Sequence, residues 1–355
     1  MKTVAELYPE QAKQVGEDGL VYLDVRTVPQ IRLSGLAWEK KNGNYHRMDD
    51  AFESEYTLGV NIRSNNTSGV QATVKTNTKT IGVHMVLNKP DFMEHMPDNG
   101  VAGVDIFKGN GLQKRFWQIA ACYNRESEYT RVFSCDGQLE DYTFNLPLYS
   151  GVEKMEIGLL PDAVISEPEP YAVQKPVLVH GSSITQGGCA SRPGNCYVNM
   201  LSRMLNVEII SLGFSSNARG DEIVAKLIAG LDISAFIYDY DHNAPDAEYL
   251  KKTHEKFFQI IRDAKPDLPI IIMTKPDYDD NPVEGEKRKA VIYQTYMSAV
   301  KAGDQNVYFI DGSQLFGHDF FRDCCTVDRN HPTDLGFSRM AAGVAPVLKL
   351  ALGLV

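Results

Sequence analysis

The chain has 355 residues, 43% of them hydrophobic, and a formal net charge of −10. This length and apolar content suffice for two packed domains, so we expect a soluble globular enzyme. The acidic balance argues against a nucleic-acid partner, because phosphate binding needs a clustered excess of Lys and Arg. No apolar run is long enough to span a membrane, and a secretory signal is absent, which predicts a cytoplasmic protein or the processed form of a secreted or periplasmic one.

Short β-rich runs dominate the first part of the chain, separated by Gly, Asn and Asp turn signals. In chain order they are GVQATVKT, TIGVHMVLN, RFWQIAA, YTRVFSC, YTFNLPL and KMEIGLL. Strands at this spacing without intervening helices are typical of an antiparallel sandwich. We therefore predict an all-β, jelly-roll-like sandwich domain over residues 1–164, followed by a linker at 165–175.

From residue 176 onward, apolar strands alternate with helical stretches. The strands are PVLVH, VEIISL, AFIYDY, PIIIMT and VYFID, and helical periodicity covers residues 247–264, 286–303 and 335–354. This alternation predicts an α/β domain over residues 176–355, a flavodoxin-like, doubly wound parallel sheet of five strands. Ligands of such sheets bind beyond the carboxyl ends of the strands, so we expect the chemistry there.

Three of these strand ends and loops carry the groups that a serine nucleophile needs. Ser183 follows the first strand, and Asp328 lies three residues before His331, so one loop can present a carboxylate and the base that it orients. The backbone N–H groups of Ser183 and Gly213, with the side-chain amide of Asn243, are candidate oxyanion donors. Physical reasoning alone leaves Ser182 open as a rival nucleophile.

These residues, in this order, resemble the conserved blocks of the SGNH (GDSL-type) hydrolases. The nucleophile block falls on residues 181–185, which makes Ser183 the nucleophile, with Ser182 in place of the usual Asp. The resemblance assigns oxyanion roles to Gly213 and Asn243, and the last block, Asp-x-x-His, is intact as residues 328–331, followed by a helix started by Thr333.

Two departures fall in the third block, where Asp241 and Ala244 replace a glycine and an acidic residue. An extra carboxylate near an oxyanion hole works against catalysis. Residues 103–107, GVDIF, resemble the Gly-x-Asp-Leu-Tyr pattern of a two-domain subgroup that carries a β-sandwich before the hydrolase.

The resemblance implies a serine esterase that hydrolyses small acyl esters, acetyl above all, on a carbohydrate or glycoconjugate, with the sandwich helping to bind sugar. Two alternatives stay open: a catalytically inactive carbohydrate-binding or scaffolding protein, and a hydrolase of lipid or thioester acyl chains. A small-molecule or oligosaccharide acyl ester is therefore the expected partner, and the oligomeric state is open.

Other residues carry weaker signals. His242, Arg192 and Asn217 are candidate substrate contacts from loops above the site, and His180 is expected to be a packed strand residue. The spacing of the eight histidines predicts no metal site, and no cofactor is implied. Pairing of Cys189 with Cys196 is open, with unpaired thiols favoured in a chain of this length.

Overall fold

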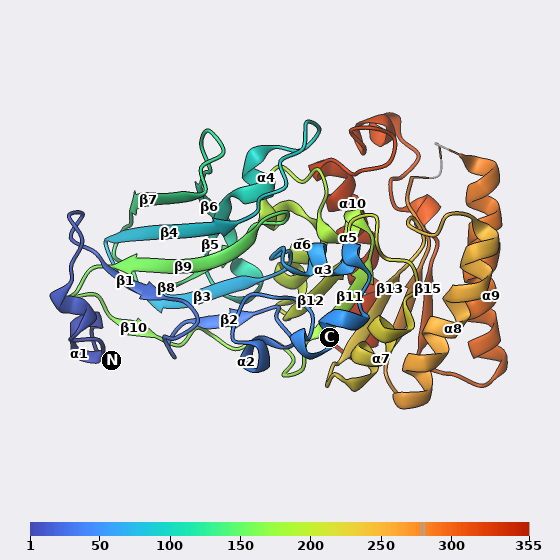
Figure 1. The fold of residues 1–355 in the computed structure, drawn as a ribbon, viewed down its shortest axis with the longest axis horizontal. Coiled ribbons are helices and arrows are strands. Elements are labelled where there is room, and N and C mark those ends of the chain that lie inside the picture. The colour runs from blue at the N-terminus through green and yellow to red at the C-terminus, as the bar shows by residue number, and fades with distance from the viewer. Residues whose placement is uncertain (278, 280, 355) are drawn as a thin grey trace.

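A computed structural model describes residues 1–277, 279 and 281–354, and its N-terminal part consists of two antiparallel sheets (Figure 1). One sheet has the strand order β1-β9-β4-β7, and the other has the order β10-β3-β8-β5-β6 with β2 paired to β3. The strands are β1 Val21–Asp24, β2 Arg32–Ser34, β3 Gln71–Thr76, β4 Thr80–Asn88, β5 Val104–Lys108, β6 Arg115–Ala120, β7 Glu128–Ser134, β8 Glu140–Asn145, β9 Gly151–Leu159 and β10 Ile165–Ser166. The predicted all-β sandwich is confirmed.

Several short elements of this part were not predicted as separate strands or helices. They include β1, β2 and β10, which have two to four residues each and too few positions to show a two-residue alternation. Four short α-helices also interrupt the strands: α1 Val4–Leu7, α2 Glu39–Asn42, α3 Leu58–Ser64 and α4 Asp98–Ala102. Of these, α3 lies where the sandwich meets the rest of the molecule (Figure 1).

The C-terminal part is a five-stranded parallel sheet with the order β12-β11-β13-β14-β15, which is the predicted flavodoxin-like arrangement. Its strands are β11 Val177–Gly181, β12 Ile209–Gly213, β13 Ala235–Asp239, β14 Ile270–Met273 and β15 Val307–Ile310. The helices are α5 Ser183–Gln186, α6 Tyr197–Leu205, α7 Glu222–Gly230, α8 Ala247–Ala264, α9 Pro282–Lys301 and α10 Asp334–Ala351. No helix among the described residues is long and apolar enough to cross a membrane.

The two faces of the parallel sheet belong to two different hydrophobic clusters. Val177 and Val179 of β11 point into a core shared with α6, α10 and the sandwich. Leu178, between them, points into a core shared with α7, α8 and α9. Because side chains alternate along a strand, each strand feeds both cores. The sandwich and one face of the α/β sheet are therefore joined by continuous apolar packing.

The chain between the two parts is fixed to the sandwich over much of its length. Ile165–Ser166 pairs with β3. Further along, the hydroxyl of Tyr171 lies 3.0 Å from that of Ser34, and the guanidinium of Arg32 covers the tyrosine ring at 4.1 Å. The predicted linker thus begins as a strand and continues as a segment held by side-chain contacts.

Candidate active site

The turn after β11 gives its two serines different surroundings. Ser182 is the N-cap of α5, and its hydroxyl accepts a hydrogen bond from the N–H of Ile184 at 3.2 Å. Ser183 is the first residue of the helix, so its own N–H lacks an intrahelical partner. Ser183 as a residue is only 7% exposed, and its hydroxyl faces His331. The hydroxyl of Ser182 therefore caps the helix, and the hydroxyl of Ser183 is presented to the histidine.

The position of α5 is set by a buried carboxylate at the end of β13. Asp239 accepts hydrogen bonds from the hydroxyls of Thr185, at 2.7 Å, and Tyr197, at 2.8 Å. Burial raises the pKa of Asp239 to about 6. A side chain at Gly181 would lie 2.1 Å from the Thr185 hydroxyl, so only glycine lets α5 start this close to the strand.

Ser183, His331 and Asp328 form a continuous hydrogen-bonded chain. Ser183 Oγ lies 3.0 Å from His331 Nε2, and His331 Nδ1 lies 2.7 Å from Asp328 Oδ2. The other carboxylate oxygen accepts the backbone N–H of His331 at 2.7 Å. Partial burial acts to raise the pKa of Asp328, but the hydrogen bonds from His331 and its backbone outweigh it and lower the pKa. The carboxylate is thus kept ionised beside the imidazole.

A tight loop holds these last two residues in register. Val327 donates its N–H to the carbonyl of His331 at 2.9 Å, and Arg329 between them has a φ of +68°. The left-handed residue reverses the chain so that residues 328 and 331 face each other. Thr333 then caps α10 by accepting the N–H of Gly336, which confirms the predicted helix start.

Asn243 is oriented as a hydrogen-bond donor. Its side-chain oxygen accepts the backbone N–H of Ala218 at 3.2 Å, which leaves the amide NH₂ to donate elsewhere. The neighbouring carboxylate of Asp241, expected to disturb the site, is buried and turned toward Arg288 of α9, 3.2 Å away. Arg288 also binds the carbonyls of Asp241 and Ala244, so it shapes the loop that carries Asn243.

The sequence predicts that the N–H of Gly213 is an oxyanion donor, but the structure points this N–H elsewhere. Phe214 donates its N–H to Gly181 of β11, so the N–H and carbonyl of Gly213, one residue earlier, point to the opposite side. On that side the buried Arg47 binds the carbonyls of Ser211, at 2.7 Å, and Gly213, at 3.0 Å. This geometry does not favour Gly213 as a donor. A glycine is nevertheless needed at position 213, because a Cβ there would lie 2.3 Å from the backbone nitrogen of Gln186.

A turn after β12 presents another backbone donor. The N–H of Asn217 bonds to the carbonyl of Phe214 at 2.9 Å, which places Ser216 at the third position of a β-turn with a φ of +62°. The N–H at that position is not used by the turn itself. Ser215, beside it, interacts with the hydroxyl of Tyr149, which in turn donates to the carbonyl of Ser183 at 3.3 Å.

Each of the three residues that the sequence predicts to contact substrate interacts with another residue of the protein. Arg192 forms an ion pair with the buried Asp105 of β5 at 2.7 Å. His242 pairs with Asp277; burial opposes its charge, but the carboxylate outweighs burial and raises the pKa of His242. Asn217 donates to the carbonyl of Ser215 at 2.6 Å. None of these contacts tests binding of a substrate, so that role stays a prediction.

Two residues near Ser183 come from the sandwich and were missed. Tyr149 follows β8, and His95 lies in the loop before α4, with its ring centroid 5.4 Å from that of His331. Nothing local in the sequence marks them, because they meet the site only through the packing of the two parts. His180 is buried and stacked on Phe257, as expected of a packed strand residue, and Cys189 and Cys196 are both free thiols.

The comparisons with known proteins agree with this architecture. Residues 174–349 match the GDSL-like lipase/acylhydrolase family, and residues 20–165 match the GxDLY N-terminal domain of SGNH-hydrolase-type esterases. The chain belongs to the GDSL-like lipase/acylhydrolase family and is a hydrolase of ester bonds. No curated protein matches it.

Solved structures with the same fold cover nearly the whole chain. A protein described as a GDSL-like lipase from Bacteroides ovatus is 26% identical with a TM-score of 0.84, covering 95% of this chain and 99% of that one. The salicylyl-acyltransferase SsfX3 of a tetracycline biosynthetic pathway is 18% identical with a TM-score of 0.77, covering 96% and 99%. An acetyl xylan esterase from Butyrivibrio proteoclasticus is 13% identical with a TM-score of 0.55, covering 94% and 99%.

Proposed function

We propose that the protein is a serine esterase that removes small acyl groups, acetyl above all, from a carbohydrate or glycoconjugate. The observation that carries this proposal is the chain of hydrogen bonds from Ser183 through His331 to Asp328. A serine hydroxyl is a weak nucleophile until a base within hydrogen-bond reach takes its proton, and the base needs a partner that fixes its orientation. Both requirements are met here.

The reaction proceeds in two acyl-transfer steps. His331 accepts the proton of Ser183 as Oγ attacks the ester carbonyl, while Asp328 stabilises the imidazolium. The protonated His331 then gives the proton to the leaving alcohol, and the acyl group stays on Ser183. A water molecule, deprotonated by His331, attacks the acyl-enzyme and releases the acid.

The developing oxyanion needs donors aimed from several directions. For two of these positions we propose the N–H of Ser183 and the side-chain NH₂ of Asn243, which are the donors that the sequence analysis names. For the third we propose the N–H of Ser216 in place of Gly213, because the turn exposes it while the Gly213 peptide faces Arg47.

Two features support a polar alcohol and a small acyl group. A cavity of about 390 Å³, which Ser183 does not line, is bordered by polar groups that include Arg63, Asn66 and Asp91. Asn66 accepts a hydrogen bond from Gln186 of α5 at 3.0 Å, which connects the cavity wall to the nucleophile turn. Next to the catalytic histidine, a Cβ at Gly188 would lie 3.3 Å from the His331 ring and 2.9 Å from the Tyr149 hydroxyl, so little space remains there.

A second candidate, hydrolysis of longer acyl chains, is favoured by a different observation. Leu58 and Ile62 of α3 are 76% and 53% exposed, and a Cβ at Gly59 between them would overlap the Asn217 side chain. An apolar surface therefore borders the loop that follows β12. Such exposed apolar residues near a site can bind an acyl chain.

The test compares p-nitrophenyl acetate with p-nitrophenyl octanoate in wild type, Ser183→Ala and Ser182→Ala. Turnover that is abolished in Ser183→Ala, retained in Ser182→Ala and faster on acetate supports the proposal. Faster turnover of octanoate would favour the second candidate. Absence of turnover, together with no labelling of Ser183 by a fluorophosphonate probe, would favour an inactive carbohydrate-binding protein.

A further inference from the structure

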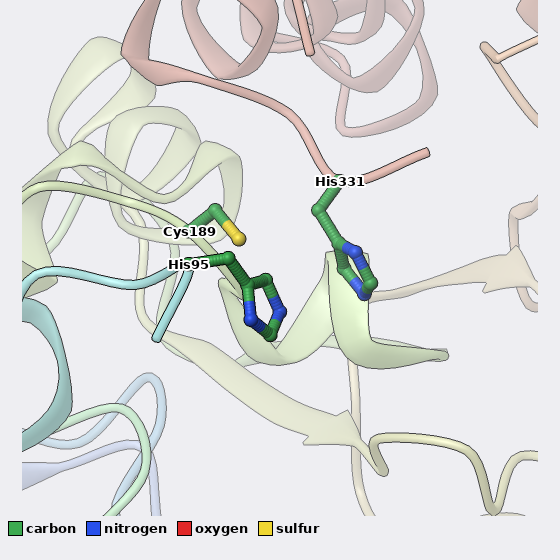
Figure 2. A group of neighbouring side chains, drawn as sticks. All are labelled: His95, Cys189 and His331. Atoms are coloured by element: carbon green, nitrogen blue, oxygen red, sulfur yellow. The ribbon is translucent and has the colours of Figure 1, made fainter. Parts of the chain in front are cut away.

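Three metal-binding side chains from separate parts of the chain converge beside the nucleophile. His95 comes from the sandwich, Cys189 follows α5, and His331 precedes α10. Their nitrogen and sulfur ligand atoms all lie within 4.8 Å of one another. Figure 2 shows the ring of His95 beside the sulfur of Cys189, with His331 across from both.

We propose that His95, Cys189 and His331 bind a zinc ion, and that the bound ion inhibits the hydrolase. One thiolate and two imidazoles are donors that zinc takes in tetrahedral protein sites, with a water molecule in the fourth position. Calcium and magnesium prefer oxygen ligands and are not expected here. On binding, Cys189 releases its thiol proton to solvent and both histidines bind as neutral imidazoles.

Burial raises the pKa of the Cys189 thiol to about 12, so the metal must displace its proton, whereas two other features of the surroundings favour metal binding. His331 Nδ1 is held by Asp328 at 2.7 Å, which leaves Nε2 as the nitrogen available to a metal. Such carboxylate–histidine pairs commonly orient metal-binding imidazoles. Cys189 is a free thiol in a left-handed backbone conformation, with a φ of +75°, so its environment and not local preference fixes its position.

The ligand atoms must approach one another to reach tetrahedral geometry. Zinc bonds of about 2.0 Å to nitrogen and 2.3 Å to sulfur place the ligand atoms of a tetrahedral site roughly 3.3–3.6 Å apart. The three ligand atoms here lie within 4.8 Å of one another, so they must approach by up to about 1.5 Å. His95 is exposed, so rotation of its side chain can shorten its own distances to Cys189 and His331 without disturbing the hydrogen bond between Asp328 and His331. The distance between Cys189 and His331 must shorten by rotation of the thiol.

The inhibition follows from competition for one nitrogen. His331 Nε2 lies 3.0 Å from Ser183 Oγ, where it would accept the serine proton. A zinc ion on this nitrogen removes the lone pair that the reaction needs. This half of the inference rests on the proposed function, whereas metal binding itself does not.

Metal binding is measured first, in Ser183→Ala, so that the result is independent of catalysis. Cobalt(II) is used as a spectroscopic substitute for zinc. We expect one equivalent to bind with a thiolate-to-cobalt charge-transfer band that zinc chloride abolishes. The band should disappear in Ser183→Ala/Cys189→Ala and persist in Ser183→Ala/Cys324→Ser, which removes an exposed cysteine outside the cluster. Loss of the band in the Cys324 control only, or no band at all, would overturn the proposed site.

Inhibition is measured next, with p-nitrophenyl acetate and each variant compared with its own rate in EDTA. Zinc chloride should inhibit wild type reversibly and magnesium chloride should not. The zinc concentration for half-inhibition should rise at least tenfold in His95→Ala and Cys189→Ala and stay unchanged in Cys324→Ser. Equal zinc sensitivity in all variants would contradict the inference. If wild type hydrolyses no ester, the proposed function fails, and the cobalt spectrum alone decides the metal site.

Discussion

The carboxylate of Asp105, on strand β5 of the sandwich, lies 2.7 Å from the guanidinium of Arg192 in the hydrolase part. Asp105 also accepts the backbone N–H of Gly194 at 3.0 Å and the side-chain amide of Asn145 at 2.9 Å. The aspartate of the GVDIF segment thus holds the loop between α5 and α6. This finding gives the motif a physical role in joining the two parts of the molecule.

We expect Arg192→Met to destabilise the protein by about 3 kcal/mol, because it leaves the buried Asp105 without its ion-pair partner. The methionine keeps an apolar side chain against Phe116, whose ring the guanidinium covers at 3.8 Å. Urea unfolding measures the loss, and adding Asp105→Asn should restore part of it. If Arg192 instead binds substrate, the variant would raise KM while its unfolding free energy stays near that of wild type.

Arg288→Met is expected to destabilise the fold by a similar amount, about 3 kcal/mol, and to lower kcat. The arginine neutralises the buried Asp241 and binds two carbonyls of the loop that presents Asn243. The double variant with Asp241→Asn removes the unpaired charge and should recover part of the stability. A single variant as stable as wild type would show that this ion pair does not support the loop.

Asp328→Asn should reduce kcat on the order of a hundredfold or more with a smaller effect on KM, because the carboxylate orients and stabilises the imidazolium formed during the reaction. Steady-state hydrolysis of p-nitrophenyl acetate measures both constants. Asp323→Asn, an exposed change five residues earlier, is the matched control. Equal kcat values in the two variants would contradict the assigned role.

Asn243→Ala should reduce kcat about a hundredfold, which is typical of removing one oxyanion donor. Asn243→Asp keeps the size of the side chain but replaces the donating NH₂ with a carboxylate oxygen, so we expect at least as large a loss. Circular dichroism checks that both variants fold. An aspartate variant that retains the wild-type kcat would exclude the amide as a donor.

The buried His254 should make the protein less stable in mild acid. Burial lowers its pKa to about 3, whereas an unfolded histidine titrates near 6.5. The unfolded state therefore binds a proton first as pH falls, and stability present above pH 6.5 is lost below it. Between pH 7 and pH 5 this group should cost about 2 kcal/mol.

The measurement is urea unfolding of wild type and His254→Gln at both pH values. The loss on going from pH 7 to pH 5 should be about 2 kcal/mol smaller in the variant, because the contributions of the other titrating groups cancel in the difference. Glutamine can keep a hydrogen bond to Thr295, which lies 2.8 Å from His254 Nδ1. Identical losses in both proteins would show that His254 does not titrate in this range.

The sequence alone determined the two-part architecture and the order of the strands that carry the site. The helix predicted at 247–264 coincides with α8, because its apolar residues recur every three or four positions. Asp246 caps its start, and Pro266 follows its end. Ser183, Asp328 and His331 are predicted from short local patterns at the end of a strand or before a helix, and the resemblance to the SGNH hydrolases selects Ser183 over Ser182. Hydrophobic periodicity and turn chemistry are local properties, and the sequence displays them directly.

Tertiary structure decided the features that depend on direction and on distant partners. Strand pairing decides which side of β12 the Gly213 peptide faces. The packing of α9 against the loop that carries Asp241 decides that Arg288 neutralises this carboxylate. His95 is 236 residues from His331 in sequence, yet their ring centroids are 5.4 Å apart. No local pattern encodes such a meeting, because it results from apolar burial that joins the sandwich to one face of the parallel sheet.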